Sequence, residues 1–132
     1  MKTTLKLTIL LFVAVLGISC NTKSQSQIDS ISVITPTEFK EKSVNNTIID
    51  VRTPQEFSEG HIEGAVNINY FDKTFLDQIA KYEKNEPLFI YCKSGNRSSQ
   101  ASKKMADLGF KQIYDLEGGI LNWVKNNNEV KK

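Results

Sequence analysis

From residue 30 onward, short apolar runs alternate with stretches in which apolar residues recur every three or four positions. Short runs rich in β-branched residues predict strands, and the longer spacing predicts amphipathic helices. We expect strands at residues 31–35, 47–51, 66–70, 87–91 and 113–116. Strands that alternate with helices are typical of a parallel sheet with helices on both faces. The pattern therefore predicts an α/β fold built on a five-stranded parallel sheet.

The helices between these strands carry recognisable start and stop signals. Thr35–Glu38 and Thr53–Glu56 each combine a threonine N-cap, a proline at the first helical position and a glutamate that completes a capping box. The first helix should end near Val44, and the second at Gly60 in a left-handed cap. The remaining helices are expected at residues 71–84, from the Cys92 loop to a cap at Gly109, and at 119–126.

A different pattern precedes this domain, which we assign to residues 30–126. Lys2 and Lys6 are followed by the apolar run Leu7–Ile18, and together they indicate a signal peptide over residues 1–19. As a helix the run would rise about 18 Å, well short of the roughly 30 Å hydrocarbon core of a bilayer. Residues 20–29 are predicted to form a flexible tether, and residues 127–132 a polar, solvated tail.

The end of the apolar run, Gly17–Cys20, resembles the lipobox of bacterial lipoproteins. A lipobox usually has leucine three places before the cysteine, whereas here Gly17 is at that place and Leu16 one step before it. If Cys20 is lipidated, several acyl chains would anchor the protein, since stable attachment requires two or more. Plain cleavage near Ser19 followed by secretion is the alternative. Both predict export to the cell envelope, either anchored to the membrane or periplasmic.

Charge and composition narrow the function classes. The chain has 17 Lys and Arg against 15 Asp and Glu. Removing residues 1–19 takes away Lys2 and Lys6 and no acidic residue, so the mature domain has no net charge. No basic stripe with interleaved aromatic residues appears, which argues against a nucleic-acid partner. The single histidine, His61, offers no cluster of metal ligands.

Cys92 is the residue with the clearest chemical potential. If Cys20 is lipidated, Cys92 is the only thiol left, so no internal disulfide forms. A lone thiol is either a buried small apolar group or a reactive one. Cys92 follows the strand at 87–91 and precedes a glycine-containing loop and a helix, where open α/β sheets place their sites. Loop amides and the helix start would favour an anion there, and therefore the thiolate.

The loop Cys92–Ser98, with the sequence CKSGNRS, resembles the active-site loop of the rhodanese family. Asp50–Phe57 and Gly60–Ile68 resemble the N-terminal signature of that family, and Leu116–Ile120 with Trp123 its C-terminal one. These motifs occur in order over roughly residues 31–126. The resemblance implies a three-layer α/β/α rhodanese-like domain whose five parallel strands have the spatial order 3-2-4-5-1.

The same resemblance implies roles for individual residues. Cys92 would be the nucleophile that carries sulfur, and an anion pocket would be lined by the backbone of Lys93, Ser94, Gly95, Asn96 and Arg97. Arg97 would hold the loop and help to neutralise the bound anion, because its planar fork suits an oxyanion. Lys93 occupies the variable position, where a cation would favour an anionic donor such as thiosulfate.

Four further residues have a structural interpretation beside a functional one. Asp50 and Arg52 match the first motif, either as substrate contacts or as an ion pair that supports the loop. His61 could in principle deprotonate Cys92, but within its motif the family uses it mainly for structure. Trp123 is interpreted as a core residue rather than a stacking platform.

These inferences predict a sulfurtransferase that works in two steps and needs no cofactor. The Cys92 thiolate would take the outer sulfur of thiosulfate or a similar donor, and the resulting persulfide would pass it on. Because no second cysteine can resolve the persulfide, the acceptor must be external: cyanide, a thiol or a partner protein. The prediction requires a thiol that solvent can reach.

Two other function classes stay open. Cysteine-dependent phosphatases and arsenate reductases use a related fold, but they place five residues between cysteine and arginine. Here four residues, Lys93–Asn96, separate Cys92 from Arg97, which favours sulfur over a phosphoryl group. The other class is a non-enzymatic interaction module or envelope sulfur carrier. The presence of Cys92, Gly95 and Arg97 argues against a pure interaction module.

Overall fold

The computed structural model describes residue 25 and residues 28–132. The predicted signal peptide, Cys20 and most of the predicted tether lie outside these residues. Among the described residues, no helix has the length and apolar character needed to cross a bilayer. The elements in chain order are β1 (Ile31–Ile34), α2 (Pro36–Lys42), β2 (Thr47–Asp50), α3 (Pro54–Glu59), β3 (Val66–Asn67), α4 (Phe75–Ile79), β4 (Leu88–Tyr91), α5 (Asn96–Asp107), β5 (Ile113–Leu116) and α6 (Gly119–Lys125).

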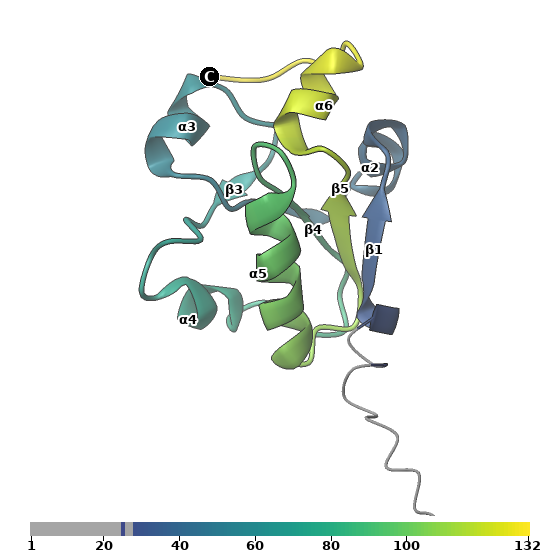
Figure 1. Cartoon of the computed structure of the whole chain (residues 1–132), viewed down its shortest axis with the longest axis vertical. Coiled ribbons are helices and arrows are strands. Elements are labelled where there is room, and N and C mark those ends of the chain that lie inside the picture. The colour runs from purple at the N-terminus through teal and green to yellow at the C-terminus, as the bar shows by residue number, and fades with distance from the viewer. Residues whose placement is uncertain (1–24, 26–27) are drawn as a thin grey trace, which may run out of the picture.

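The five strands form a single sheet in the order β1-β5-β4-β2-β3, with every neighbouring pair parallel. The predicted fold class and strand order are therefore confirmed. Figure 1 shows α5 lying across the sheet, and α3 and α6 near the end of the sheet at which β4 and β5 finish. That end carries the loop after Cys92, because the carboxyl ends of parallel strands share one edge.

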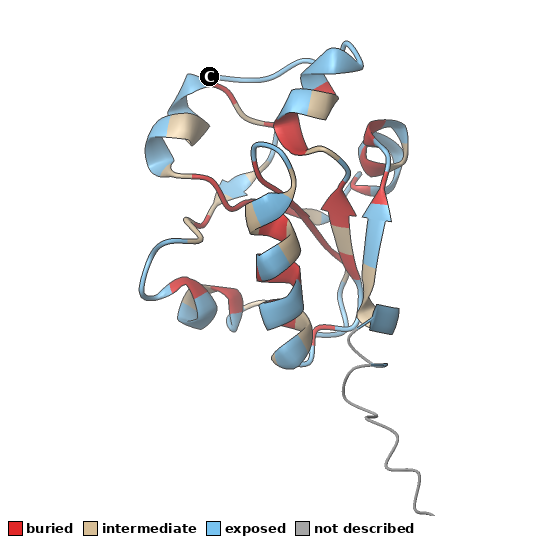
Figure 2. Cartoon of the chain, viewed as in Figure 1, coloured by how far each residue is buried: buried red, intermediate tan, exposed pale blue. Residues whose placement is uncertain are grey.

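Each face of the sheet has its own apolar core, and the buried positions run through the strands and the inner sides of the helices (Figure 2). On one face α4 and α5 contribute Phe75, Ala101 and Met105. On the other face α2 and α6 contribute Phe39 and Trp123, whose rings meet edge to face at 6.1 Å. Helices on both faces explain why β4 is buried along its whole length.

The predicted helix starts are confirmed for α2 and α3. In both helices the threonine hydroxyl accepts from the glutamate N–H, and the glutamate carboxylate accepts from the threonine N–H. Gly60 ends α3 as expected, but its φ of 157° and ψ of 133° are not those of a left-handed cap. Its carbonyl instead accepts a hydrogen bond from Arg52, which draws the chain into an extended path.

Two elements are shorter than the sequence predicts. The helix expected over residues 71–84 is limited to Phe75–Ile79, because the Asp72 carboxylate accepts from the Thr74 N–H and hydroxyl and holds a turn. The strand expected over residues 66–70 is limited to Val66–Asn67, because its partner β2 ends at Asp50.

The predicted polar tail differs from a free end. Its residues are exposed, as expected, except Asn128, which is half-buried. However, Lys131 pairs with His61 in an antiparallel bridge with two hydrogen bonds of 2.8 Å. The Trp123 indole N–H also donates to the carbonyl of Glu129 at 2.9 Å. The last residues therefore return to the domain and lie beside α3, as the C-terminus in Figure 1 shows.

Candidate functional site

Cys92 directly follows β4, and the three residues after it, Lys93–Gly95, lead into α5. Gly95 is the N-cap of α5 and has a φ of 106°, a left-handed conformation that glycine adopts at little cost. Its N–H donates to the sulfur of Cys92 at 3.0 Å. Within the described chain, the N–H groups of Lys93, Ser94 and Asn96 donate to no protein group. The loop is therefore lined by backbone donors, as expected for an anion site.

The start of α6 fixes the first half of this loop. Ile120 and Leu121 donate their N–H groups to the carbonyls of Cys92 and Lys93 at 2.9 and 3.2 Å. These donors belong to the first turn of α6, which has no side-chain cap, so the loop satisfies them. A side-chain carbon on Gly119 would lie 2.6 Å from the Cys92 carbonyl oxygen and even closer to that of Lys93. The sequence predicts the glycine motif but not this contact.

The Cys92 thiol is covered, contrary to the expectation that solvent reaches it. Cys92 is 1% exposed and packs with the core on the α5 side of the sheet. The cover is thin, since Lys93, Ser94 and Asn96 are all exposed. The physical reason is the N–H of Gly95, which closes the loop onto the sulfur. A reactant reaches this sulfur only when the loop shifts.

Arg97 binds the carboxylate of Glu56, whereas the prediction has it neutralise a bound anion. Its two terminal nitrogens donate to the two carboxylate oxygens of Glu56 at 2.8 and 2.9 Å, and its guanidinium lies 5.7 Å from the Phe71 ring centre. The hydrogen bonds from Arg97 lower the pKa of Glu56 to about 2. The predicted role of holding the loop fits this pair, whereas the positive charge is already neutralised by Glu56. The capping-box motif identified Glu56 but not this second function.

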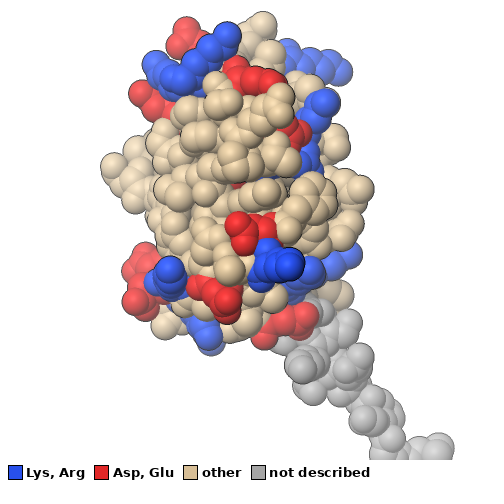
Figure 3. All heavy atoms as spheres, turned by 90° about the vertical axis from the view of Figure 1, so that its left-hand side faces the viewer, with Lys and Arg blue, Asp and Glu red and all other residues tan. Residues whose placement is uncertain are grey.

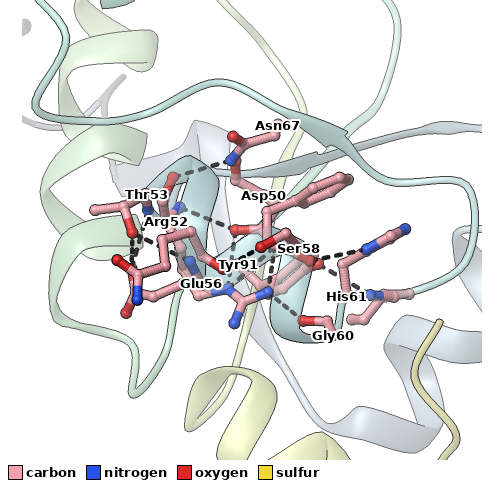
Figure 4. Close-up of polar contacts among 12 residues, drawn as sticks. Asp50, Arg52, Thr53, Glu56, Ser58, Gly60, His61, Asn67 and Tyr91 are labelled. Atoms are coloured by element: carbon pink, nitrogen blue, oxygen red, sulfur yellow. Dashed lines mark hydrogen bonds and ion pairs between the residues drawn. The ribbon is translucent and has the colours of Figure 1, made fainter. Parts of the chain in front are cut away.

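Asp50 and Arg52 form a buried ion pair (Figure 4). The side chains are 0% and 7% exposed, and Arg52 donates to both carboxylate oxygens over 2.7–3.0 Å. Arg52 also donates to the Gly60 carbonyl at 2.7 Å and lies over the Tyr91 ring. Of the two roles left open by the sequence, the structural one describes this geometry. The pair holds the backbone in place at both ends of α3, and it thereby positions Glu56 on that helix.

His61 and Trp123 occupy structural positions, as predicted. The His61 ring stacks on Phe57 with 3.8 Å between centroids, and its Nδ1 lies 3.0 Å from the Phe57 carbonyl oxygen. Trp123 is 6% exposed and packs against Phe39. The described residues contain no cluster of three potential metal ligands.

A buried carboxyl that sequence reasoning missed lies beneath the loop. Asp115 on β5 is 3% exposed, and burial raises its pKa to about 6. It sits beside Ile90 in the sheet register, one inward-facing position before Cys92 on β4. Successive side chains of a strand point to opposite faces, so residue 115 shares the face of the apolar Ile113, which is the signal that could have found it.

The charged side chains on one face and the cavity lined by described residues are separate from the Cys92 loop. On the face drawn in Figure 3, Lys and Arg side chains lie beside Asp and Glu side chains towards both ends, with a largely uncharged band between them. A cavity of about 570 Å³ opens beside α2 and the C-terminal segment, and Lys40, Ile62 and Trp123 are among the residues that line it. No residue of the Cys92 loop lines this cavity, so the chemistry of the loop does not extend to it.

The chain is similar to rhodanese-like domains and to proteins named thiosulfate sulfurtransferases. A family model described as a rhodanese-like domain matches residues 35–126. The thiosulfate sulfurtransferase GlpE of Pseudomonas aeruginosa is 32% identical over 96 residues, which cover 72% of this chain and 86% of that protein. Thiosulfate sulfurtransferase 16 of Arabidopsis thaliana is 35% identical over 88 residues, which cover 59% and 73%.

Similar proteins also include longer ones. A tRNA uridine(34) hydroxylase of Buchnera aphidicola is 39% identical over 82 residues, which cover 58% of this chain but 25% of that protein. The chain spans about half the length of some other curated relatives. Among solved structures, a rhodanese-related protein of Thermoplasma volcanium has a TM-score of 0.68 and 29% identity, over 75% of this chain and 96% of that one.

We expect replacement of Glu56 by Gln to destabilise the domain at neutral pH, because it breaks the pair with Arg97. A carboxylate whose pKa is lowered on folding stabilises the folded protein at pH values above its ordinary pKa. For Glu56 this stabilisation is lost as the pH falls through about 2. Glu56 is partly exposed, so the loss should be about 1–2 kcal/mol at pH 7 and should shrink towards zero near pH 2. Urea denaturation at both pH values measures it.

The matched control is Glu59→Gln, an exposed carboxylate on the same helix. It should change the free energy of unfolding by less than about 0.5 kcal/mol. Equal effects of the two substitutions, or a Glu56→Gln deficit that persists at pH 2, would contradict the importance assigned to the pair.

Proposed function

Because the chain belongs to the family of rhodanese-like domains, we propose that it is a sulfurtransferase that carries a sulfane sulfur on Cys92. The observation that carries the proposal is the position of the Cys92 sulfur, directly after a central strand and within a loop whose Gly95 N–H donates to it. Relatives named thiosulfate sulfurtransferases support this reaction class.

The proposed reaction has two steps. The Cys92 thiolate attacks the outer sulfur of thiosulfate, a new S–S bond forms, and sulfite leaves with the electron pair of the broken S–S bond. An external thiolate or cyanide then attacks the outer sulfur of the persulfide, and the Cys92 thiolate is released. Covalent storage divides a difficult transfer into two easier displacements. The amides of residues 93–97 favour the anionic forms that occur in both steps.

The covered sulfur sets a condition on this reaction. Both steps need an approach to the Cys92 sulfur, which the Gly95 N–H now closes off. Exposed residues 93, 94 and 96 can move away without breaking apolar contacts, while α6 retains the carbonyls of residues 92 and 93. Loop motions in proteins take roughly nanoseconds to microseconds.

Phosphatase chemistry is the second candidate, and the length of the loop weighs against it. The loop between Cys92 and Arg97 is one residue shorter than in the phosphatases. The shorter loop favours a sulfur atom over a tetrahedral phosphoryl group. Because the Arg97 guanidinium pairs with both oxygens of Glu56, a dianion of either kind, phosphate or thiosulfate, would depend on the loop amides and on Lys93.

Location is a separate part of the proposal. We propose that the chain is exported and anchored by lipid on Cys20, with a small sulfur donor and an external thiol or protein as partners. The basic start, the apolar run and Gly17–Cys20 support it. Intact mass spectrometry of the mature protein should show a chain that begins at Cys20 with added acyl groups. A mature chain without acyl groups would contradict the anchor and favour a periplasmic protein.

We predict that Cys92→Ser abolishes thiosulfate:cyanide sulfur transfer while the protein stays folded. A hydroxyl is a far weaker nucleophile at neutral pH, and the isosteric change leaves the loop contacts in place. The assay measures thiocyanate formation, with hydrolysis of an aryl phosphate measured alongside. Ser94→Ala in the same loop is the control and should retain most of the transfer activity. Transfer by the Cys92→Ser protein, or efficient phosphate hydrolysis by the unaltered chain, would overturn the assignment.

A further inference from the structure

The segment of residues 128–131, which follows α6, is held on the domain by contacts to which the proposed reaction gives no role. Asn128 is half-buried and residues 129–131 are exposed, so little apolar burial keeps the segment in place. Hydrogen bonds hold it instead, and they attach its two ends to different helices. Figure 1 shows the chain running from α6 to a position beside α3.

The first end of the segment is attached to α6 through Trp123. The indole N–H of Trp123 donates to the Glu129 carbonyl at 2.9 Å. The backbone and side-chain N–H groups of Asn128 donate to the Trp123 carbonyl, each at 3.3 Å. The first turn of the same helix holds the carbonyls of Cys92 and Lys93. The segment is therefore attached to the helix that fixes the first half of the Cys92 loop.

The other end of the segment is attached to α3 through His61. Lys131 and His61 exchange two backbone hydrogen bonds of 2.8 Å. The His61 ring stacks on Phe57 of α3, with 3.8 Å between the ring centroids. The same helix carries Glu56, which binds Arg97 just after the loop. The segment is therefore also attached to the helix that fixes the second half of the loop.

The Cys92 loop thus has its two ends on two helices, and the segment of residues 128–131 joins those helices. We propose that Glu129 and Lys131 are positioning residues, whose backbone groups tie α6 to α3 and so keep the Gly95 N–H closed over the Cys92 sulfur. This inference rests on the proposed function only in that sulfur transfer requires the loop to open.

The segment is the part of this support that releases most easily. Exposed hydrogen bonds with little apolar burial open more often than a packed core does. Both apolar cores lie within the sheet and its helices, and no residue of the segment belongs to them. When the segment detaches, α3 and α6 lose their connection across the loop while the sheet stays folded. The loop then opens without unfolding of the domain.

The test replaces Lys131 by Pro in the full chain, because proline has no N–H to donate to the His61 carbonyl. Hydrogen exchange of the Gly95 amide, followed by NMR at a fixed pH, measures opening of the loop. We expect the Gly95 amide to exchange roughly fivefold faster in Lys131→Pro, the factor that corresponds to loss of one typical net hydrogen bond.

Two control variants separate the backbone bridge from other effects. Lys131→Ala keeps both backbone hydrogen bonds and removes only the side chain, whose 3.9 Å contact with Glu63 is exposed. Lys132→Pro places a proline at the next exposed position. Each control should leave the exchange rate of the Gly95 amide within roughly twofold of the unaltered chain, because surface substitutions have small effects. An acceleration in either control as large as in Lys131→Pro overturns the proposal.

The amides of β4 distinguish positioning from a general loss of stability. This strand is buried along its length, and amides of core strands exchange through global unfolding. In Lys131→Pro their exchange should change less than that of Gly95. Equal acceleration of Gly95 and β4, or an unchanged Gly95 rate, overturns the proposal.

Thiosulfate loading of Cys92, measured by intact mass in the same proteins, keeps the two proposals apart, since hydrogen exchange does not depend on sulfur transfer. Selectively faster Gly95 exchange in a chain that takes up no sulfur retains this inference and rejects the proposed function. Normal loading with an unchanged Gly95 rate in Lys131→Pro retains the function and rejects the inference.

Discussion

Gly119 leaves no room for a side chain against the carbonyl groups of Cys92 and Lys93, and the shape of the site follows from that contact. Because α6 approaches so closely, the N–H groups in its first turn donate hydrogen bonds to the carbonyls of both residues. With the carbonyls held on the α6 side, the loop turns back through Gly95 and directs its N–H at the sulfur. Because Ile120 and Trp123 anchor α6 in the core on one face of the sheet, while Cys92 packs with the core on the other face, packing on the opposite face from the sulfur helps to define the loop.

A second support reaches the loop from the opposite side. The buried pair of Asp50 and Arg52 fixes α3, and α3 presents Glu56 to Arg97 at the start of α5. These ion pairs hold the backbone in place, since Arg52 is paired with Asp50 and Arg97 is paired with Glu56. What remains at the loop is a set of backbone dipoles and the exposed Lys93, which suit an anionic sulfur group.

Local sequence signals predicted the parts of the fold that depend on neighbours in the chain. The two capping boxes at Thr35 and Thr53 and the apolar run before Cys92 determine where α2, α3 and β4 begin or end. The strand order came from the resemblance of three motifs to the rhodanese family. The Asp72 turn, which shortens α4, uses an equally local signal that was outweighed by the apolar spacing at Phe75 and Ile79.

Long-range pairing was beyond the sequence. Arg97 and Glu56 are 41 positions apart, and nothing in either motif says that one neutralises the other. Burial of the Cys92 sulfur depends on how closely the loop and α6 approach, which a motif does not specify. Nothing in the sequence of β5 indicates that the Asp115 carboxyl is buried with no hydrogen-bond partner for its Oδ1.

The central claim is that this covered sulfur accepts a sulfur atom while the domain stays folded. Intact mass spectrometry before and after brief exposure to thiosulfate tests it directly. The account predicts the added mass of one sulfur atom, located on Cys92 and removed by cyanide. An unchanged mass under conditions that load another sulfurtransferase would contradict the account and leave the chain with the fold of the family alone.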